Sequence, residues 1–516
     1  MSQSKVPFRV LFSDDTTNIL TCESPFHKKG EPFHPDMLRA VVDETAGTGI
    51  EVHMLQPGVG AVPLWKSTHY PDHAEWFQQT YGKKLDSFSQ YVADGGDMVL
   101  DFVERCREKG LVPFISLRLN DGHHLEYAER FDEGIRHSSL SLFRFYNEHP
   151  EYRIGSDPNN WDQHVLNWAE PEVRDYKFGF IRELCENYDI DGFELDFMRH
   201  TSFFRLDETT PEERVEIMTG FVRRVREVLD RTAKPDRRRW LCVRVPAFLA
   251  AHDRLGVDLR QWVDAGVDMV NLSYFYFTEQ QGDYAEIRRM VPDATLYVEM
   301  CHTTHTGKIV VKGASYDNFT YRRTTPLQYY TTAHLAYARG LNGISAFNFV
   351  YYRSHGGEER GPFDEPPFNV FQHLGDPDWL ARQPQHYVLG ETWEGRKWGR
   401  NRGIAEVVEP GQTVTFVLDM APPSAGWQDS GRLRIQAQSD LGDSRWICAF
   451  NGLELAETED RSEPYENSYS PLLGGPEHHR AWVVPRDHMQ DGHNTVEVIL
   501  DEGQPAKLVF VDLAAQ

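Results

Sequence analysis

The sequence lacks several features that would place it in a well-defined class of proteins. Only six of its 516 residues are cysteine, and none has the CxxC or zinc-finger spacing of a metal or disulfide framework. No uninterrupted run of about 20 apolar residues is present, so we expect no helix that crosses a membrane. The sequence also has no internal repeat and no low-complexity segment. We interpret the cysteines as mostly buried free thiols, and we expect no cofactor.

Positively charged residues are outnumbered by negatively charged ones. Lysine and arginine number 54 against 79 aspartate and glutamate residues, which gives a formal net charge of −25. Such an acidic chain disfavours contact with a phosphate backbone, so we expect no nucleic-acid partner. The first residues contain no apolar signal-peptide core. We therefore predict a cytoplasmic protein with no membrane attachment. A secreted protein whose signal peptide has been removed is the alternative, and the oligomeric state stays open.

Apolar residues make up 40% of the chain and aromatic residues 12%, which is sufficient for sizeable cores. Over the first 375 residues, β-rich apolar runs alternate with helical patterns. This alternation predicts an α/β fold, a (β/α)₈ TIM barrel, over residues 1–375. Its strands are expected at 8–12, 50–55, 112–119, within 188–200, and at 240–245, 269–277, 295–301 and 343–350.

The pattern changes after about residue 376. Short β runs separated by turn residues replace the alternation, and no long helical pattern comes between them. We predict a linker over 376–395 and an antiparallel β-sandwich of the jelly-roll type over 396–516. The expected strands include 414–418, 433–437, 446–450, 481–484, 495–500 and 508–513.

The segment 188–200 (YDIDGFELDFMRH) is the most informative stretch of the sequence. Successive side chains on a strand point to opposite faces, so Glu194 and Asp196 share one face of an otherwise apolar strand. Burying two carboxylates is costly unless they face a polar pocket. We interpret Asp196 and Glu194 as candidate catalytic residues. The alternative for Glu194 is an ion pair with an arginine inside the barrel.

Active sites of such barrels lie at the C-terminal ends of the strands. Glu299, on the seventh strand, is expected across the mouth from Asp196, and its alternative role is an ion pair with Arg244. Thirteen further polar or aromatic residues at these ends are candidates for substrate binding: Asp14, Asp15, His53, Arg118, Asn120, His123, His124, His200, Arg244, Tyr274, Tyr276, His302 and Asn348. Arg118 and Arg244 suit a sugar carboxylate or sulfate, with pairing to Glu194 or Glu299 as the equal alternative.

The histidines in this set raise the question of a metal. A metal-dependent amidohydrolase needs a His-x-His pair at the end of the first strand, and this chain has Ser13, Asp14 and Asp15 there. We therefore assign no metal ligands and interpret these histidines as donors to substrate hydroxyls or as ordinary loop residues.

The segments 166–176 (LNWAEPEVRDY) and 186–196 (ENYDIDGFELD) resemble the strand-four region of glycoside-hydrolase-like TIM barrels, including bacterial glycosyl-hydrolase-like proteins. They are also similar to α-amylase and chitinase-like barrels, in which Asp-Gly opens strand four and a carboxylate closes it. The resemblance covers about 35 residues and implies that Asp196 is the strand-end aspartate. The chain departs from these patterns at two positions. Met198 stands where chitinases have an acidic residue, and Glu194 stands where amylases have arginine.

These observations predict a glycoside hydrolase that cleaves an oligo- or polysaccharide with a carboxylate pair at the barrel mouth. We expect Asp196 as nucleophile or base and Glu299 as proton donor, and the two roles are open to exchange. Two alternatives remain. One is a carbohydrate lyase or metal-dependent barrel enzyme that uses the His and Tyr cluster, and the other is a sugar-binding barrel without catalysis.

Overall fold

The structure is a computed structural model. It describes residues 6–15, 19, 22–26, 31–58, 62–122, 144–157, 160–309, 319–354, 364–392, 404, 407–465 and 475–516. The chain divides into two compact units. The first holds Met1–Phe275 and Glu286–Tyr297, and the second holds Tyr276–Ala285 and Val298–Gln516.

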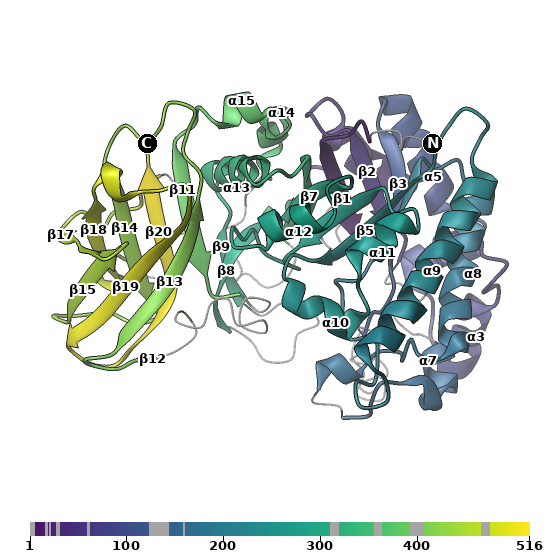
Figure 1. The fold of residues 1–516 in the computed structure, drawn as a ribbon. Helices are drawn as coiled ribbons and strands as arrows, with labels where there is room; N and C mark the ends of the chain where they lie inside the picture. The colour runs from purple at the N-terminus through teal and green to yellow at the C-terminus, as the bar shows by residue number, and fades with distance from the viewer. Residues whose placement is uncertain are drawn as a thin grey trace. The chain divides into compact units, whose positions relative to one another are not determined.

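Eight strands form the closed barrel that the sequence predicts, in the order β1-β10-β7-β6-β5-β4-β3-β2 (Figure 1). The strands are β1 (Val10–Asp15), β2 (Val52–Gln56), β3 (Val112–Arg118), β4 (Gly192–Asp196), β5 (Trp240–Pro246), β6 (Met269–Ser273), β7 (Thr295–Met300) and β10 (Gly343–Phe347). The ladders from β1 to β6 are parallel, as a chain of βα units requires.

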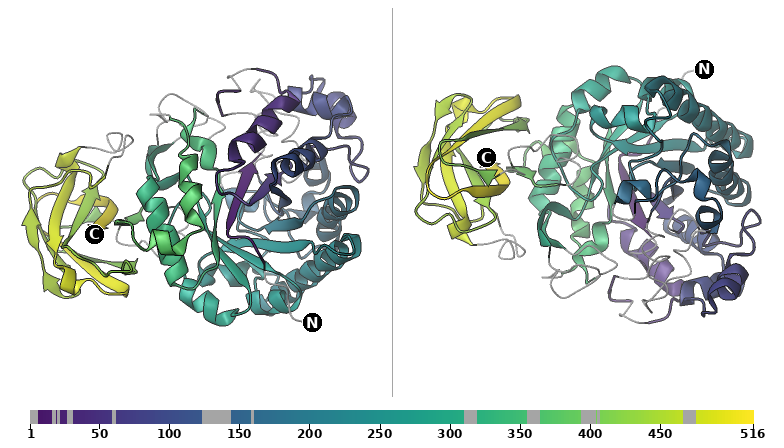
Figure 2. Two further views of the ribbon diagram at one scale, coloured as in Figure 1. Left: turned by 90° about the horizontal axis from the view of Figure 1, so that it is seen from above. Right: turned by 90° about the horizontal axis from the view of Figure 1, so that it is seen from below.

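Helices α5, α9 and α13 pack against strands of the barrel (Figure 2). The described residues include thirteen α-helices. They are α2 (Pro35–Thr45), α3 (His73–Tyr81), α4 (Ser87–Ala93), α5 (Met98–Lys109), α7 (Arg144–Glu148), α8 (Pro171–Asn187), α9 (Pro211–Thr232), α10 (His252–Leu255), α11 (Leu259–Asp264), α12 (Tyr284–Met290), α13 (Pro326–Ala338), α14 (Phe371–Leu374) and α15 (Pro377–Leu380). Among the described residues, no helix is long and apolar enough to span a membrane.

Local sequence signals set the ends of these helices. Thr210 accepts a hydrogen bond from the backbone N–H of Glu213, and the Glu213 carboxylate accepts one from the backbone of Thr210, so a capping box begins α9. Asp97 caps the first turn of α5 in a similar way. Gly110 ends α5 with φ = +75°, a conformation that glycine adopts without steric cost.

Apart from shifts of a few residues at the strand ends, two features of the barrel region differ from the sequence-based expectation. The sixth strand ends at Ser273 instead of Phe277, because Phe275 adopts a left-handed conformation with φ = +68° that interrupts the ladder. The second feature is a hairpin of β8 (Thr303–Ile309) and β9 (Phe319–Arg323), which follows β7 and which the periodicity did not indicate.

The C-terminal part of the second unit is the predicted antiparallel β domain. One sheet has the order β11-β20-β14-β18-β17, with β12 paired to β20, and the other has the order β13-β19-β15-β16. The strands are β11 (Gln385–Gly390), β12 (Val407–Val408), β13 (Thr413–Met420), β14 (Gly431–Ala437), β15 (Arg445–Phe450), β16 (Leu453–Glu454), β17 (Ala456–Thr458), β18 (His479–Val484), β19 (Gly492–Glu502) and β20 (Ala506–Ala515). Strand β11 lies inside the segment 376–395, for which we expected a linker.

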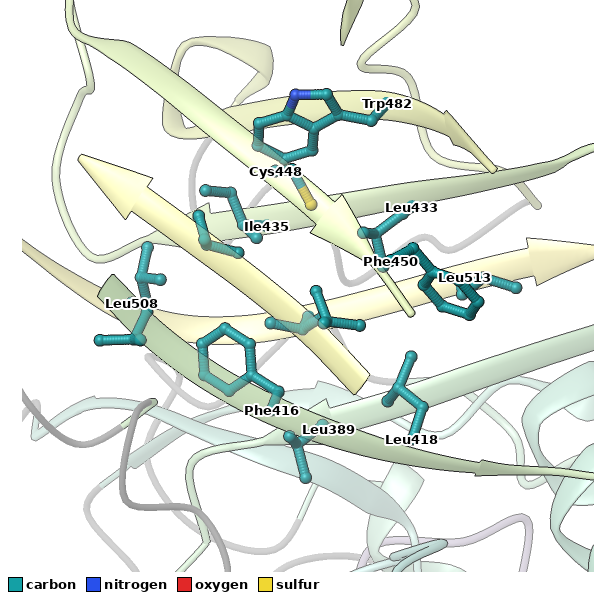
Figure 3. Close-up of a cluster of buried hydrophobic side chains, with 14 of the residues drawn as sticks. Leu389, Phe416, Leu418, Leu433, Ile435, Cys448, Phe450, Trp482, Leu508 and Leu513 are labelled. Atoms are coloured by element: carbon teal, nitrogen blue, oxygen red, sulfur yellow. The ribbon is translucent and has the colours of Figure 1, made fainter. Parts of the chain in front are cut away.

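Inward-facing side chains of both sheets form the core of this β domain (Figure 3). Strand β13 alternates in burial, as one strand of a sandwich must. Val414, Phe416 and Leu418 are buried, and Thr415 and Val417 between them are exposed. Trp482 of β18 and Leu433 of β14 come from the other sheet and are also buried. The core therefore lies between two sheets, as in a sandwich.

A buried ion network joins the hairpin β8–β9 to this β domain within the second unit. Arg322 of β9 donates to Glu463 at 2.6 Å and to Gln436 at 3.1 Å. Glu463 also accepts from Arg434 at 3.1 Å, and Arg434 donates to both carboxylate oxygens of Asp512 at 2.9 and 2.6 Å. The network supplies partners for two arginines that are almost completely buried.

Candidate active site

Asp196, at the C-terminal end of β4, is held by donors on both carboxylate oxygens. Arg244 Nη1 lies 3.0 Å from Oδ1 and 3.0 Å from Oδ2. The backbone N–H of Met198 donates to Oδ1 at 2.8 Å, and the side-chain amide of Gln56 donates to Oδ2 at 3.1 Å. Asp196 is fully buried. The ion pair and the two neutral donors together offset the cost of placing its charge inside the barrel.

Arg118, at the end of β3, forms a second buried charge cluster beside the first. Its guanidinium pairs with Asp15 at the end of β1, and it donates through Nη1 to Asp121 at 3.1 Å. Its Nε donates to Gln56 Oε1 at 2.9 Å. Gln56 therefore connects the Arg118 cluster to Asp196.

Glu194 lies one layer deeper in the barrel than Asp196. It accepts hydrogen bonds from the Ser116 hydroxyl at 2.7 Å and from the Asn271 amide at 3.2 Å, and the Cys242 thiol lies 3.4 Å away. Each of these partners belongs to another barrel strand. The prediction that Glu194 and Asp196 share a face agrees with these contacts, since both side chains reach β5, Glu194 at Cys242 and Asp196 at Arg244.

Asp14 and His53 form a pair that faces the helix layer. His53 Nε2 lies 2.9 Å from Asp14 Oδ2, and its Nδ1 lies 3.1 Å from the hydroxyl of Thr45 in α2. The imidazole also makes edge contacts with Phe12 and with Phe102 of α5. These contacts connect the strands with α2 and α5, so we leave Asp14 and His53 out of the proposed site.

The loops that follow β3 and β4 are tied together. Asn120 donates from its amide to the carbonyls of Leu166 and Ser202, each at 2.9 Å, and accepts from the Leu166 N–H at 3.2 Å. The Gly122 N–H donates to His200 Nδ1 at 3.1 Å. Asn120 and His200 thus order the loops near the end of β4. His123 and His124 lie outside the described residues.

The remaining candidates lie at the ends of β6, β7 and β10. Tyr274 is buried in the first unit with its ring 5.3 Å from that of Phe248. In the second unit, the ring of His302 lies 6.3 Å from that of Tyr276 and 5.5 Å from that of Tyr351.

Glu299 and Asn348 also belong to the second unit, and both are buried. Glu299 lies two residues after Tyr297 on β7, so the two side chains share a face, and Tyr297 belongs to the apolar cluster that includes Leu11, Met54 and Phe114. Asn348 has φ = +51°, and neither polar atom of its side chain hydrogen-bonds to a described residue.

Gln56 contacts both Asp196 and Arg118 and is absent from the set of candidate residues that the sequence indicated. A usable signal existed, because Val52, Met54 and Gln56 alternate along one strand and share a face. Gln56 is the only polar member of this trio and stands at the C-terminal end of the strand, where function is expected. Phe275 is the second omission. Its carbonyl accepts from Arg244 Nη2 at 3.4 Å, and no propensity rule places a phenylalanine at positive φ.

The described part of the chain contains no group of three or more His, Cys, Asp or Glu side chains arranged to hold a metal ion. All six cysteines are buried and none forms a disulfide with another described residue, as the sequence indicated. Among the described residues, the polar groups at the C-terminal ends of the strands β1 to β5 are carboxylates, arginines and an amide. This composition suits acid–base chemistry.

Comparison with known proteins gives matches at the level of solved structures. No protein-family model matches the sequence. No curated protein matches it either. An α-L-fucosidase isoenzyme from Paenibacillus thiaminolyticus is similar with a TM-score of 0.40 and 12% identity over 72% of this chain and 49% of that protein. The chain thus spans about half the length of the fucosidase.

Two further barrel structures are similar. A maltogenic α-amylase from Thermotoga neapolitana matches with a TM-score of 0.36 and 11% identity, covering 97% of this chain and 98% of the amylase. A family 20 β-N-acetylglucosaminidase matches with a TM-score of 0.38 and 12% identity, covering 72% of this chain and 68% of that protein.

Proposed function

We propose that the protein is a glycoside hydrolase in which Asp196 acts as nucleophile or base and Glu299 as proton donor. The observation that carries the proposal is the setting of Asp196. Its carboxylate stands at the C-terminal end of a barrel strand and is oriented by Arg244, Gln56 and the Met198 N–H. Cleavage of a glycosidic bond requires such an ionised carboxylate together with a second carboxyl that delivers a proton.

The composition of the barrel interior supports this role. The inward-facing layers of a TIM barrel are mostly apolar and branched. Here the layer at the C-terminal ends of β1 to β5 contains instead Asp15, Gln56, Arg118, Asp196 and Arg244. Buried charge of this density costs stability unless it serves a purpose, and functional sites are where proteins accept such a cost.

Glu299 is the proposed proton donor. Glu299 lies near the C-terminal end of β7. It is two residues after Tyr297, which packs in the apolar cluster, and the two side chains share a face. Strand β7 belongs to the same closed barrel as β4, and the two are separated by β5 and β6 in the strand order. In this proposal Tyr276, His302 and Asn348 contact the substrate, which is a carbohydrate.

The test is hydrolysis of a panel of aryl glycosides and oligosaccharides by the purified protein. Asp196→Asn and Glu299→Gln are each expected to reduce kcat by about 10³-fold or more. Asp175→Asn is the matched control, because Asp175 of α8 is exposed and forms a surface ion pair with Arg224 of α9. Full activity in both active-site variants would reject the assignment.

The same panel separates the alternatives. Products that absorb in the ultraviolet would indicate a lyase, and loss of activity on addition of a chelator would indicate a metal-dependent enzyme. Thermal stabilisation by a sugar without turnover would indicate a binding protein, since a ligand stabilises the native state that it binds.

A further inference from the structure

We infer that Gln56 is a positioning residue that fixes Asp196 as an acceptor of hydrogen bonds, so that Asp196 serves as nucleophile or base and not as proton donor. This inference rests on the proposed function. It decides which of the two carboxylates, Asp196 or Glu299, is the nucleophile or base and which is the proton donor. The inference is based on two contacts of the Gln56 amide, one with Arg118 and the other with Asp196.

The orientation of the Gln56 amide follows from the chemistry of its neighbours. Arg118 Nε carries a hydrogen and cannot accept, so the group 2.9 Å from it must be the amide oxygen of Gln56. The amide nitrogen then faces Asp196 Oδ2 at 3.1 Å. The opposite orientation would place N–H against N–H and oxygen against oxygen. Arg118 is itself held by Asp15 and Asp121, which fixes the direction of the whole chain of contacts.

The donors around Asp196 leave no acceptor for a proton. Oδ1 receives the Met198 N–H and Arg244 Nη1, and Oδ2 receives Gln56 Nε2 and Arg244 Nη1. All three neighbouring groups are donors only in this arrangement. A proton on either oxygen would therefore point at a donor hydrogen and would displace one of these contacts, which is unfavourable in a buried site.

Gln56 also links the two carboxylates of β4. Its amide nitrogen lies 3.5 Å from the Ser116 hydroxyl oxygen, and that hydroxyl donates to Glu194 at 2.7 Å. The donors and acceptors are fixed in this network. Arg118 donates to Gln56, Gln56 donates to Asp196, and Ser116 donates to Glu194. Gln56 thus donates directly to Asp196 and reaches Glu194 only through the Ser116 hydroxyl.

The test exchanges the amide for a group that titrates. In Gln56→Glu the introduced carboxyl, when protonated, accepts from Arg118 and donates to Asp196, and so reproduces the amide. When it ionises, it places a negative charge beside Asp196 and removes a donor. The charged groups that face this position are Asp15, Arg118, Asp121, Glu194, Asp196 and Arg244.

The expected result is a kcat close to that of the wild type at acidic pH, with a ratio of wild-type to variant kcat that increases as pH rises. Gln56→Met, which has neither donor nor acceptor, should reduce kcat by about 10²-fold at every pH with little change in KM. Gln78→Glu adds the same charge at an exposed position of α3 and is the matched control. Parallel pH profiles for the wild type and Gln56→Glu would overturn the inference.

A second measurement does not depend on activity. The carboxyl ¹³C resonance of Asp196, identified by its absence in Asp196→Asn, reports the ionisation of that side chain directly. At pH 7 we expect the chemical shift of a carboxylate in the wild type, because every group that faces Asp196 donates a hydrogen bond to it. A protonated Asp196 in the wild type at neutral pH would overturn the inference. A wild type that shows the carboxylate shift but hydrolyses no glycoside would retain the inference about Gln56 and reject the proposed function.

Discussion

Arg244 Nη1 lies 3.0 Å from both carboxylate oxygens of Asp196, and the two residues are direct partners in the ladder between β4 and β5. Both side chains are almost completely buried. A buried ion pair of this kind gains little over an apolar pair, but removal of one partner leaves the other charge without compensation. The pair therefore makes a clear prediction for stability that is separate from catalysis.

Arg244→Met should lower the free energy of unfolding by about 3–5 kcal/mol, because it leaves a buried carboxylate without its cation. Adding Asp196→Asn to this variant should restore a large part of the loss, since the double variant contains no uncompensated charge. Denaturant unfolding of the four proteins in the cycle measures both effects. Arg231→Met is the control, because Arg231 and Glu186 form an exposed pair that should contribute at most about 1 kcal/mol. Equal losses at the two arginines would contradict the prediction.

Glu183 of α8 provides a pH-dependent prediction. Its carboxylate accepts from the Trp65 indole at 2.9 Å, from the Ser67 hydroxyl at 2.6 Å and from the Thr68 hydroxyl at 2.7 Å, so it anchors the loop after β2. Burial acts to raise the pKa of Glu183, but these hydrogen bonds outweigh it, and the pKa is lowered from its ordinary value. A lowered native pKa stabilises the fold above the pKa of the unfolded chain and loses that effect as pH falls.

Glu183→Gln should therefore cost about 2–3 kcal/mol at pH 7, since an amide cannot accept from all of these donors. The difference from the wild type should shrink as pH falls below about 4.3, the ordinary pKa of glutamate. Urea unfolding at a series of pH values gives this difference. Glu186→Gln, one turn further along α8, is the matched control and should change stability little at any pH. A constant difference between pH 7 and 3 would show that the charge of Glu183 is unimportant.

Glu463 makes the corresponding prediction for the second unit. Burial acts to raise its pKa, but Arg322 and Arg434 lower it to about 2. Glu463→Gln should weaken the attachment of the hairpin β8–β9, and the loss should be largest near neutral pH and vanish as pH approaches 2. Hydrogen exchange of the described backbone amides of β9 measures the attachment. Glu459→Gln, at a side chain that is 94% exposed, is the control. Unchanged exchange in Glu463→Gln at pH 7 would contradict the prediction.

The architecture could be predicted from the sequence because it depends on repeated local patterns. The period of two within 192–196 and the capping signals at Thr210 and Pro171 arise from neighbouring residues, so they are readable without the fold. The hairpin β8–β9 escaped prediction because its sequence has no clean alternation of apolar and polar residues. The end of β6 escaped because a positive φ at Phe275 is imposed by tertiary surroundings.

The candidate site was predictable only in part. Sequence periodicity indicated that Glu194 and Asp196 share a face, and strand order indicated that polar residues gather at the C-terminal ends. The sequence did not distinguish the strand-end residues that face the barrel interior from those that face the helices. Asp14 and Asp15 are adjacent in the sequence, yet one contacts His53 on the helix side and the other pairs with Arg118.

The sequence by itself thus determined the barrel, the antiparallel domain and the carboxylates of β4, because helix and strand periods and caps act over a few residues. Only the tertiary structure decided which arginine holds Asp196 and which way the amide of Gln56 points. Gln56 and Asp196 lie 140 residues apart in the chain. Their contact depends on the closure of the barrel, which brings the ends of β2, β3 and β4 to one layer, and the direction of each hydrogen bond follows from the donors that meet there.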